Sequence, residues 1–241
     1  MPKTEFKLKY QTVSVSDSAI PVIIVAAGNS SRMGGINKQL LKICGVPIIA
    51  RTLKAFENSE YVSKIILVTK EDMILDMQGI AESYGITKLT DIVPGGDTRQ
   101  KSVLCGIKRL SKEEKAVLIH DGARPFVSLE IIKNCVLAMK EYDGCVTAIP
   151  AVDTVKKVNG DGTVERTVDR KYIYLAQTPQ GVRVEKYLEA LSSNEEIFTD
   201  DASVLESIGV KVKTVLGDSK NIKITSKSDI VIAEGILKGE T

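Results

Sequence analysis

The stretch PVIIVAAGNSSRMGG, residues 21–35, contains the strongest fold signal of the sequence. An apolar, strand-sized segment at 22–26 runs directly into a turn of small and polar residues. The alternation continues along the 241-residue chain: strands are predicted at 64–69, 88–93, 116–120 and 144–149, and amphipathic helices at 47–58, 72–84, 98–110 and 129–141. Strands that alternate with helices of about 10–15 residues predict right-handed βαβ units. We therefore expect an α/β fold whose parallel sheet has helices on both faces.

The pattern changes after Pro150. Segments 152–158 and 163–168 alternate in polarity around Asn159-Gly160-Asp161-Gly162, which predicts a β-hairpin with positive φ at both turn centres. The hairpin contains few large apolar residues, so it is poorly suited to forming a core of its own. Two interpretations stay open: an arm that reaches a second subunit, or a simple surface hairpin.

The remaining segments complete the predicted domain. Helices are predicted at 184–191, 200–207 and 227–237, and strands at 210–216 and 221–225. Because we find no internal repeat and no low-complexity linker, we predict one domain over residues 1–241, in which residues 1–18 form a polar tail or a short added strand. Pro47 is expected to be the first helical residue of its segment, where its missing N–H costs nothing.

The composition excludes several classes of protein. The chain is 43% hydrophobic, has a net charge of +2 and contains no Trp. A nearly balanced charge argues against binding to bulk nucleic acid or to membrane surfaces. No apolar run approaches the roughly 18–20 residues of a membrane span, and no signal-peptide core stands near the start. A cytoplasmic location is expected.

The single histidine and the four cysteines narrow the chemistry further. With His120 alone, one chain cannot build a zinc site from two or three histidines. The cysteines Cys44, Cys105, Cys135 and Cys145 are scattered through apolar segments without paired spacing. They are therefore expected to be reduced, small and buried.

Three polar loops follow predicted strands, at the edge where open parallel sheets bind ligands. The first covers 26–35 and is followed by Lys38 and Gln39. Its small residues allow backbone N–H groups to approach a phosphate, to which Arg32 and Lys38 bring positive charge. Its spacing matches neither a dinucleotide fingerprint nor a Walker loop, so the loop alone is equally compatible with a plain connection.

The second loop, 95–102, has Gln100 where a Walker loop requires glycine, and Asp97 or Thr98 can cap the helix that follows. The third loop, 120–125, offers Asp121 as a magnesium ligand, or as a partner for Arg124. His120 points to the other side of its strand and is expected to pack rather than react. Together the loops predict a metal-assisted nucleotide site that acts by stabilising charge at phosphorus.

Eight ordered motifs give the sequence a specific resemblance. They are AAGNSSRMG…KQ, GGDTRQKS, HDGARP, AVDTVK, TVDR, AQTPQ, TDDAS and NIKIT. In this order, from about residue 22 to 237, the sequence resembles the 2-C-methyl-D-erythritol 4-phosphate cytidylyltransferase family of the non-mevalonate isoprenoid pathway. The resemblance implies a Rossmann-like nucleotidyltransferase fold with a mostly parallel twisted sheet, and a homodimer joined by β-arms at about 152–170. It also implies transfer of CMP from CTP to methylerythritol phosphate, with release of pyrophosphate.

The resemblance also implies roles for individual residues. CTP would be held by Ala26, Ala27, Gly28, Gly96, Asp97, Arg99, Ser102 and Gly122. Charge on the α-phosphate and on the departing pyrophosphate would be stabilised by Arg32 and Lys38, with Arg170 and Lys223 as further catalytic cations. The sugar phosphate would contact Asp121, Arg124, Thr154, Arg170, Thr178, Thr199 and Lys223. Asp121 would hold magnesium, and Arg170 would reach across the dimer.

These roles agree with the chemistry of the implied reaction. The attacking phosphate is already ionised at neutral pH, so the task is to hold two anions in line, which requires cations on both. One position departs from the family pattern, because Lys220 stands where some members carry an acidic residue proposed as a second metal ligand. We therefore assign only Asp121 to the metal.

Alternative functions remain at this stage. Ribitol 5-phosphate cytidylyltransferases share the fold, CTP and the QTPQ and NIKIT stretches, but usually show AGG and DAVRP where this chain has AAG and DGARP. Sugar-1-phosphate and molybdenum-cofactor nucleotidyltransferases share only the first loop. A catalytically silent nucleotide-binding module would bind CTP without turnover.

Overall fold

A seven-stranded sheet forms the centre of the computed structural model, which describes residues 19–28, 38–193 and 198–239. The predicted tail at 1–18 and Arg32 lie outside the described residues. In spatial order the strands are β11-β7-β10-β6-β1-β4-β5. Their bounds are β1 (Ile20–Val25), β4 (Val62–Thr69), β5 (Leu89–Pro94), β6 (Ala116–Asp121), β7 (Gly144–Pro150), β10 (Tyr174–Arg183) and β11 (Val212–Leu216).

The sheet is mostly parallel, as the sequence predicts. β1 pairs in parallel with β4 and β6, β5 with β4, and β11 with β7. β10 is the exception, because it runs antiparallel to both β6 and β7. No strand is predicted from the sequence at 174–183, and two local features disfavour one there: Pro179 lacks an N–H and Gly181 is a weak strand former. Pairing on both sides outweighs these local preferences.

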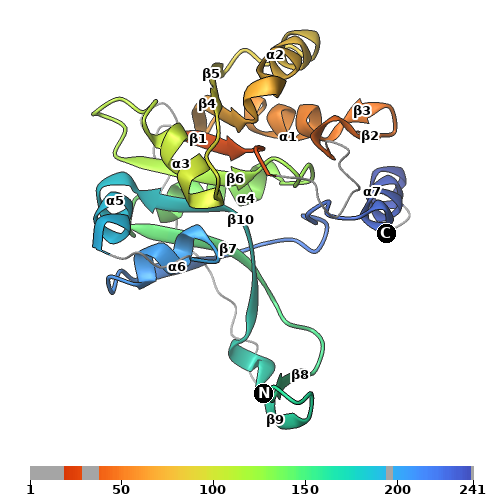
Figure 1. Cartoon of the computed structure of the whole chain (residues 1–241), viewed down its shortest axis with the longest axis vertical. Coiled ribbons are helices and arrows are strands. Elements are labelled where there is room, and N and C mark those ends of the chain that lie inside the picture. The colour runs from red at the N-terminus through yellow and green to blue at the C-terminus, as the bar shows by residue number, and fades with distance from the viewer. Residues whose placement is uncertain (1–18, 29–37, 194–197, 240–241) are drawn as a thin grey trace.

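Helices cover both faces of the sheet, which confirms the predicted layering (Figure 1). One face is covered by α1 (Ile48–Glu57), α2 (Ile74–Ser83) and α4 (Leu129–Ala138), and the other by α3 (Arg99–Ile107), α5 (Val184–Ser193) and α6 (Asp201–Glu206). Alternate residues of β1 supply the two cores: Val22 and Ile24 pack with the first group of helices, and Ile23 packs with the second. A fully buried aliphatic side chain contributes about 1.5–3 kcal/mol, so the sheet is stabilised from both sides.

The C-terminal helix α7 (Lys227–Lys238) lies apart from these layers, beside the small hairpin of β2 (Lys42–Ile43) and β3 (Val46–Pro47) (Figure 1). A third buried cluster joins them through Ile43, Ile48, Ile224 and Ala233. In the described part of the chain, every helix is too short or too polar to cross a bilayer. A cytoplasmic location stays a prediction.

Three local expectations are wrong. Pro47 ends β3 and caps α1 instead of being its first helical residue. Residues 221–225 form no strand, because only the Ile224 N–H bonds a neighbouring loop, at Ala123 O (2.8 Å), and no ladder continues from it. Cys44 is exposed at the β2–β3 turn and Cys105 is half-buried, although Cys135 and Cys145 are buried and all four are free.

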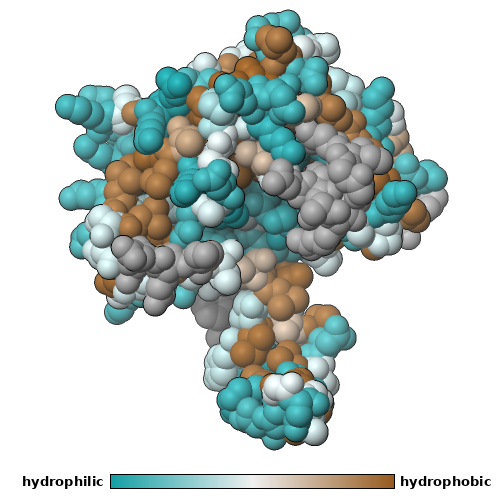
Figure 2. All heavy atoms as spheres, viewed as in Figure 1, coloured by the Kyte–Doolittle hydropathy of each residue, from teal (hydrophilic) through white to brown (hydrophobic). Residues whose placement is uncertain are grey.

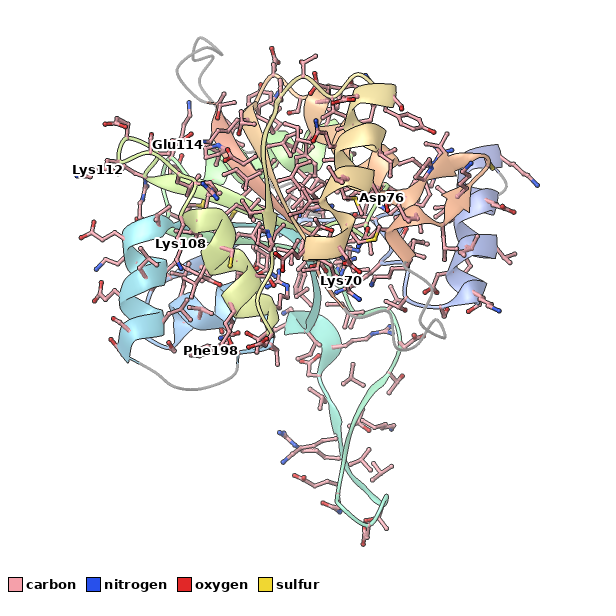
Figure 3. The ribbon with its side chains drawn as sticks, turned by 45° about the horizontal axis from the view of Figure 1, so that its top comes forward. Lys70, Asp76, Lys108, Lys112, Glu114 and Phe198 are labelled. Atoms are coloured by element: carbon pink, nitrogen blue, oxygen red, sulfur yellow. The ribbon has the colours of Figure 1, made fainter. Side chains whose placement is uncertain are left out.

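The predicted hairpin is a protruding arm (Figures 1 and 3). It continues the antiparallel β7–β10 pair and ends in β8 (Val155–Val158) and β9 (Val164–Val168). Its turn differs from the expected one, because only Gly162 has positive φ (85°) and the Gly162 N–H donates to Asn159 O at 3.0 Å. The Asn159 N–H donates to Thr163 O at 2.9 Å, which leaves a three-residue loop, 160–162, that needs only one left-handed glycine at its last position.

Candidate active site

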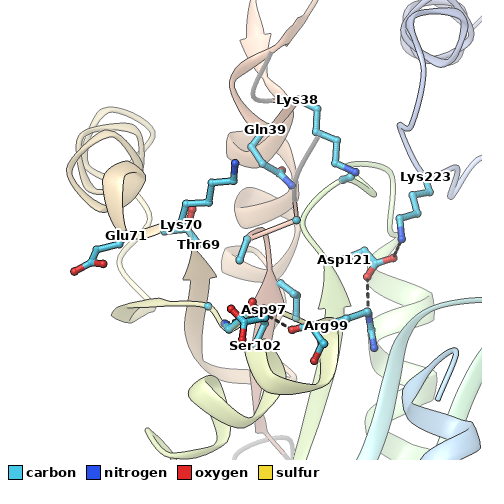
Figure 4. Close-up of a pocket in the computed structure, with 17 residues that line it drawn as sticks. Lys38, Gln39, Thr69, Lys70, Glu71, Asp97, Arg99, Ser102, Asp121 and Lys223 are labelled. Carbon is cyan, nitrogen blue, oxygen red and sulfur yellow. Dashed lines mark hydrogen bonds and ion pairs between the residues drawn. The ribbon is translucent and has the colours of Figure 1, made fainter. Parts of the chain in front are cut away.

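A cavity of about 450 Å³ opens at the carboxyl ends of β1, β4, β5 and β6 (Figure 4). The three polar loops predicted from the sequence contribute most of its walls, together with the end of β4 and Lys223. The predicted residues that line it are Ala27, Gly28, Lys38, Gly96, Asp97, Arg99, Ser102, Asp121 and Lys223. Figure 4 shows Lys38 and Lys223 on the same side of the cavity as Asp121. The sheet edge therefore brings together groups that are far apart in sequence.

Close backbone packing shapes the floor of this cavity. A Cβ atom at Gly95 would lie only 2.4 Å from Ala27 Cβ, so the first and second loops can meet only because this position is glycine. The Ser102 hydroxyl, on α3, accepts the Gly96 N–H at 3.1 Å and donates to Thr98 O at 2.9 Å. Thr98 caps α3 by accepting the Lys101 N–H, as expected. The result is a fixed loop beside a helix N-terminus, which suits an anionic ligand.

A second, smaller cavity of about 260 Å³ adjoins the first. Three side chains, those of Arg99, Asp121 and Lys223, line both cavities. Thr178 also lines the smaller cavity, at the point where β10 leaves its ladder with β7 between residues 176 and 180. Two ligands placed in the two cavities would meet at the shared wall around Asp121.

Asp121 lies at the centre of a cluster of cations. Its Oδ2 is 2.7 Å from Lys223 Nζ and 3.8 Å from Arg124 Nε, and its Oδ1 is 3.4 Å from Arg99 Nε. Burial alone would raise the pKa of Asp121, but the charges of Arg99 and Lys223 outweigh burial and lower the pKa well below the usual carboxyl range. Asp121 is therefore ionised at neutral pH and able to bind a cation.

Arg99 is held from its other side by Asp201, a residue that the sequence analysis missed. Arg99 Nη2 is 2.6 Å from Asp201 Oδ2, and the Tyr187 hydroxyl donates to Asp201 Oδ1 at 2.9 Å. Burial alone would lower the pKa of Arg99, but attraction by Asp201 and Asp121 raises it above its ordinary value. The only sequence signal for Asp201 is its place inside the TDDAS motif, next to a cap residue.

Residues 221–225 cross the site as an extended segment. Arg124 Nη1 donates to Asn221 O at 2.7 Å, and the Asn221 side-chain amide donates to Thr178 O at 2.9 Å. This segment carries Lys223 to Asp121. The predicted strand is thus absent because its polar groups bond to the site instead of to a neighbouring strand.

The other predicted residues are distributed around these two cavities. Ala26 and Gly122 are buried directly behind the larger cavity and do not line it. Arg124, Thr178 and Thr199 line the smaller cavity. Arg32 lies outside the described residues. Thr154 and Arg170 lie exposed on the arm and line neither cavity, and Arg170 donates to Val152 O.

Several lining residues have no counterpart in the sequence analysis. Thr69, Lys70 and Glu71 at the end of β4 line the larger cavity, and Gln180 and Asp200 line the smaller one. Figure 3 shows Lys70 in a second view. No loop rich in glycine or cations follows β4, so composition gave no signal there. Their position at the carboxyl end of a predicted parallel strand could have indicated Thr69, Lys70 and Glu71, whereas the signal for Gln180 and Asp200 is their place inside the AQTPQ and TDDAS motifs.

A mostly parallel α/β sheet with a cavity lined by Lys38, Arg99 and Lys223 at its carboxyl edge, and with a second cationic cavity beside it, is the arrangement that a nucleotidyltransferase requires. Comparison with known families makes the assignment specific. The family model described as 2-C-methyl-D-erythritol 4-phosphate cytidylyltransferase matches residues 20–239. The chain belongs to this family.

Individual relatives agree with the family assignment. Proteins of that name from Bacillus licheniformis and Geobacter metallireducens are 41% and 42% identical, and each alignment covers 91% of this chain and at least 96% of the relative. A crystal structure of 4-diphosphocytidyl-2C-methyl-D-erythritol synthase from Anaerococcus prevotii superposes with a TM-score of 0.83 at 31% identity, covering 94% of this chain and 100% of that chain. A crystal structure of 2-C-methyl-D-erythritol 4-phosphate cytidylyltransferase from Thermus thermophilus superposes with a TM-score of 0.73 at 28% identity, covering 91% of this chain and 99% of that chain.

Proposed function

We propose that this protein transfers CMP from CTP to 2-C-methyl-D-erythritol 4-phosphate, giving the CDP-alcohol and pyrophosphate. The observation that supports the proposal most directly is the pair of cavities that meet at Asp121, Arg99 and Lys223. The larger cavity suits a nucleoside triphosphate, and the smaller one, lined by Arg124 and Thr178, suits a polyol phosphate. Membership of the family supports the same pair of substrates.

The cations around the shared wall perform the main task of the reaction. A phosphate that attacks the α-phosphorus of CTP brings two anions together, and the repulsion between them must be offset. Lys223 and Arg124 would hold the attacking phosphate, while Lys38 and Arg32 would stabilise the charge that develops on the α-phosphate and on pyrophosphate. Preorganised cations act most strongly where charge develops in the transition state. No general base is required, because the nucleophile is already ionised.

The residues at the shared wall fit a magnesium ion that arrives with the triphosphate. Magnesium is usually held by one or two carboxylates together with substrate phosphates and water, and Asp121 supplies an ionised carboxylate at the wall. In the described part of the chain, no three His, Cys, Asp or Glu side chains form a cluster that could hold a metal by itself. When bound, magnesium would neutralise phosphate charge, and Lys223 and Arg99 would then be released to contact phosphate oxygens.

We further propose that the arm joins two chains into a homodimer. Figure 2 shows hydrophobic residues on the surface of the arm. Their exposure is unusual for a monomer: Val152 is 76% and Tyr172 is 74% exposed. Exposed apolar surface of this kind is typical of a contact with a partner. The exposed Arg170 on the same arm would then complete the acceptor cavity of the partner chain.

Pyrophosphate release tests the proposed function. The protein is mixed with CTP, magnesium and either 2-C-methyl-D-erythritol 4-phosphate or ribitol 5-phosphate. Release with the first acceptor alone is the expected result. Release with ribitol 5-phosphate alone would keep the nucleotide site but overturn the acceptor. CTP binding without release from either acceptor would contradict the proposal and favour a silent nucleotide-binding module.

A further inference from the structure

The single histidine lies directly behind two residues of the smaller cavity, Arg124 and Thr178, which is the cavity proposed to bind the polyol phosphate. His120 is fully buried in β6, and its ring packs edge-on against Phe56 with the ring centres 4.8 Å apart. This confirms the expectation that it packs. Both ring nitrogens also have polar partners: Nδ1 lies 3.0 Å from Thr178 Oγ1, and Nε2 lies 3.1 Å from Arg124 O. Any buried imidazole needs both nitrogens paired, but here both partners, Arg124 and Thr178, are residues that line the smaller cavity.

The partners determine which nitrogen carries the proton. Arg124 O is a carbonyl and can only accept, so Nε2 must carry the hydrogen. The ring is fully buried and neither ring nitrogen bonds a carboxylate, so burial favours the neutral ring, in which Nδ1 has a free lone pair and accepts. The Thr178 hydroxyl must therefore donate to His120 Nδ1. The same hydroxyl oxygen accepts the Asp121 N–H at 3.1 Å, so its hydrogen and one lone pair are both committed.

We propose that His120 is a positioning residue: by taking the hydrogen of the Thr178 hydroxyl, it leaves that hydroxyl able only to accept a hydrogen bond from a ligand. Thr178 is 4% exposed and lines the smaller cavity, where its remaining lone pair can receive a hydrogen bond from a hydroxyl of the polyol phosphate. Without His120, the hydroxyl hydrogen is free to turn, and the site no longer distinguishes donors from acceptors at this point. The inference rests on the proposed function and names a determinant of acceptor affinity.

The arrangement also explains why the loop after β6 keeps its shape. The Arg124 N–H donates to Asp121 O at 3.0 Å, and His120 bonds both ends of this turn: directly at Arg124 O, and through Thr178 at the Asp121 N–H. The side chains of Asp121 and Arg124 leave from this turn toward the shared wall. A neutral ring behind them fixes their backbone without adding charge to the site.

Nitrogen NMR tests the geometry without any acceptor. Because the chain has one histidine, histidine labelled with ¹⁵N gives one pair of ring signals. We expect a protonated Nε2 and an unprotonated Nδ1 at pH 7. In Thr178→Val the Nδ1 signal should shift, whereas in Thr178→Ser it should stay. A protonated Nδ1, or no shift in Thr178→Val, would overturn the proposal.

Two substitutions at His120 test the effect on the acceptor. In His120→Asn the amide oxygen replaces Nδ1 as an acceptor for Thr178, whereas His120→Gln moves its amide away from that position. We expect the KM for the polyol phosphate to rise about tenfold in His120→Gln, the effect of about one hydrogen bond, and to recover to within about threefold in His120→Asn. The Kd for CTP, measured without acceptor, should change by less than about twofold in both.

A packing control separates positioning from structure. Phe56→Leu disturbs the ring contact but removes no hydrogen bond, so it should lower the melting temperature and leave the acceptor KM unchanged. Equal rises of the acceptor KM in Phe56→Leu and His120→Gln, or a parallel loss of CTP affinity, would overturn the proposal. If His120→Gln does not fold, the ring-nitrogen signals of the wild-type protein and of the Thr178 variants still show whether Thr178 donates to His120 Nδ1. If the wild-type protein uses neither acceptor, the proposed function fails, while those signals still decide the bond between His120 and Thr178.

Discussion

The side chains bonded around Asp121 carry more positive than negative charge, which favours an anionic ligand. Two carboxylates, Asp121 and Asp201, face three cations, Arg99, Arg124 and Lys223. The excess positive charge lies at the wall between the two cavities, where two phosphate groups would meet. Each cation is partly paired before the ligand arrives, so its position is already fixed and less side-chain entropy is lost on binding.

The ion pair between Asp201 and Arg99 makes a prediction about stability. Asp201→Asn leaves Arg99 without its closest partner in a site where Asp201 is fully buried. Breaking such a pair should lower the free energy of unfolding by about 3 kcal/mol, measured by urea denaturation. Glu189→Gln removes the exposed ion pair with Lys186 and should cost less than about 1 kcal/mol. Equal effects in the two variants would show that Arg99 does not depend on Asp201.

His120 provides a pH prediction. The pKa of His120 is lowered from 6.5 to about 4, chiefly by burial and in smaller part by the charges of Arg124 and Arg99, against the opposing effects of the Arg124 carbonyl and Asp121. Between these values the unfolded chain binds more protons than the folded one, so stability falls as pH decreases from 6.5 to 4, by roughly 3 kcal/mol. In His120→Asn this contribution should disappear. Urea midpoints with the same pH dependence in both proteins would contradict the assignment.

At the scale of elements, the loop after β5 depends on one close approach. In Gly95→Ala the new Cβ would clash with Ala27, at 2.4 Å, and force the first and second loops apart. We expect stability to fall by about 1–3 kcal/mol, and CTP affinity, measured by calorimetry, to fall with it. Gly160→Ala in the arm turn is the matched control, because nothing lies within 4 Å and its φ is not positive. Unchanged CTP affinity in Gly95→Ala would show that this contact does not shape the nucleotide cavity.

The antiparallel β10 links the site to the arm. Between residues 176 and 180 it leaves its ladder with β7 and places Thr178 in the smaller cavity, and at its other end it continues into the arm. One element therefore carries both an acceptor-cavity residue and the surface proposed for dimer contact.

At the scale of the whole molecule, an active site shared between two chains makes a distinct prediction. Arg170→Ala and Lys223→Ala should each lose most activity alone, and Arg170→Ala should do so while CTP still binds. When the two variants form mixed dimers, one site of each mixed dimer contains both intact residues, so about a quarter of the wild-type activity should return. Pyrophosphate release measured after coexpression checks this. Mixed dimers without recovery would show that Arg170 acts within its own chain.

The alternating α/β layers, the three polar loops and the hairpin at 152–168 could be predicted from the sequence alone, although its protrusion as an arm could not. These features depend on local periodicity, on turn chemistry and on short motifs, so the residues 26–28, 95–102 and 120–125 were found at the correct edge of the sheet. The resemblance added Thr178, Thr199 and Lys223, which no local pattern indicates and which the structure places at the cavities.

The remaining features depend on contacts between segments that are distant in the sequence. β10 forms despite Pro179 because strands on both sides satisfy its backbone, and residues 221–225 form no strand because their polar groups bond to the site. The partners of Asp201 and His120 come from distant segments, so their roles follow from contacts that no spacing in the sequence encodes. Local preference sets which elements can form, whereas long-range pairing and burial select which of them do, and which side chains meet.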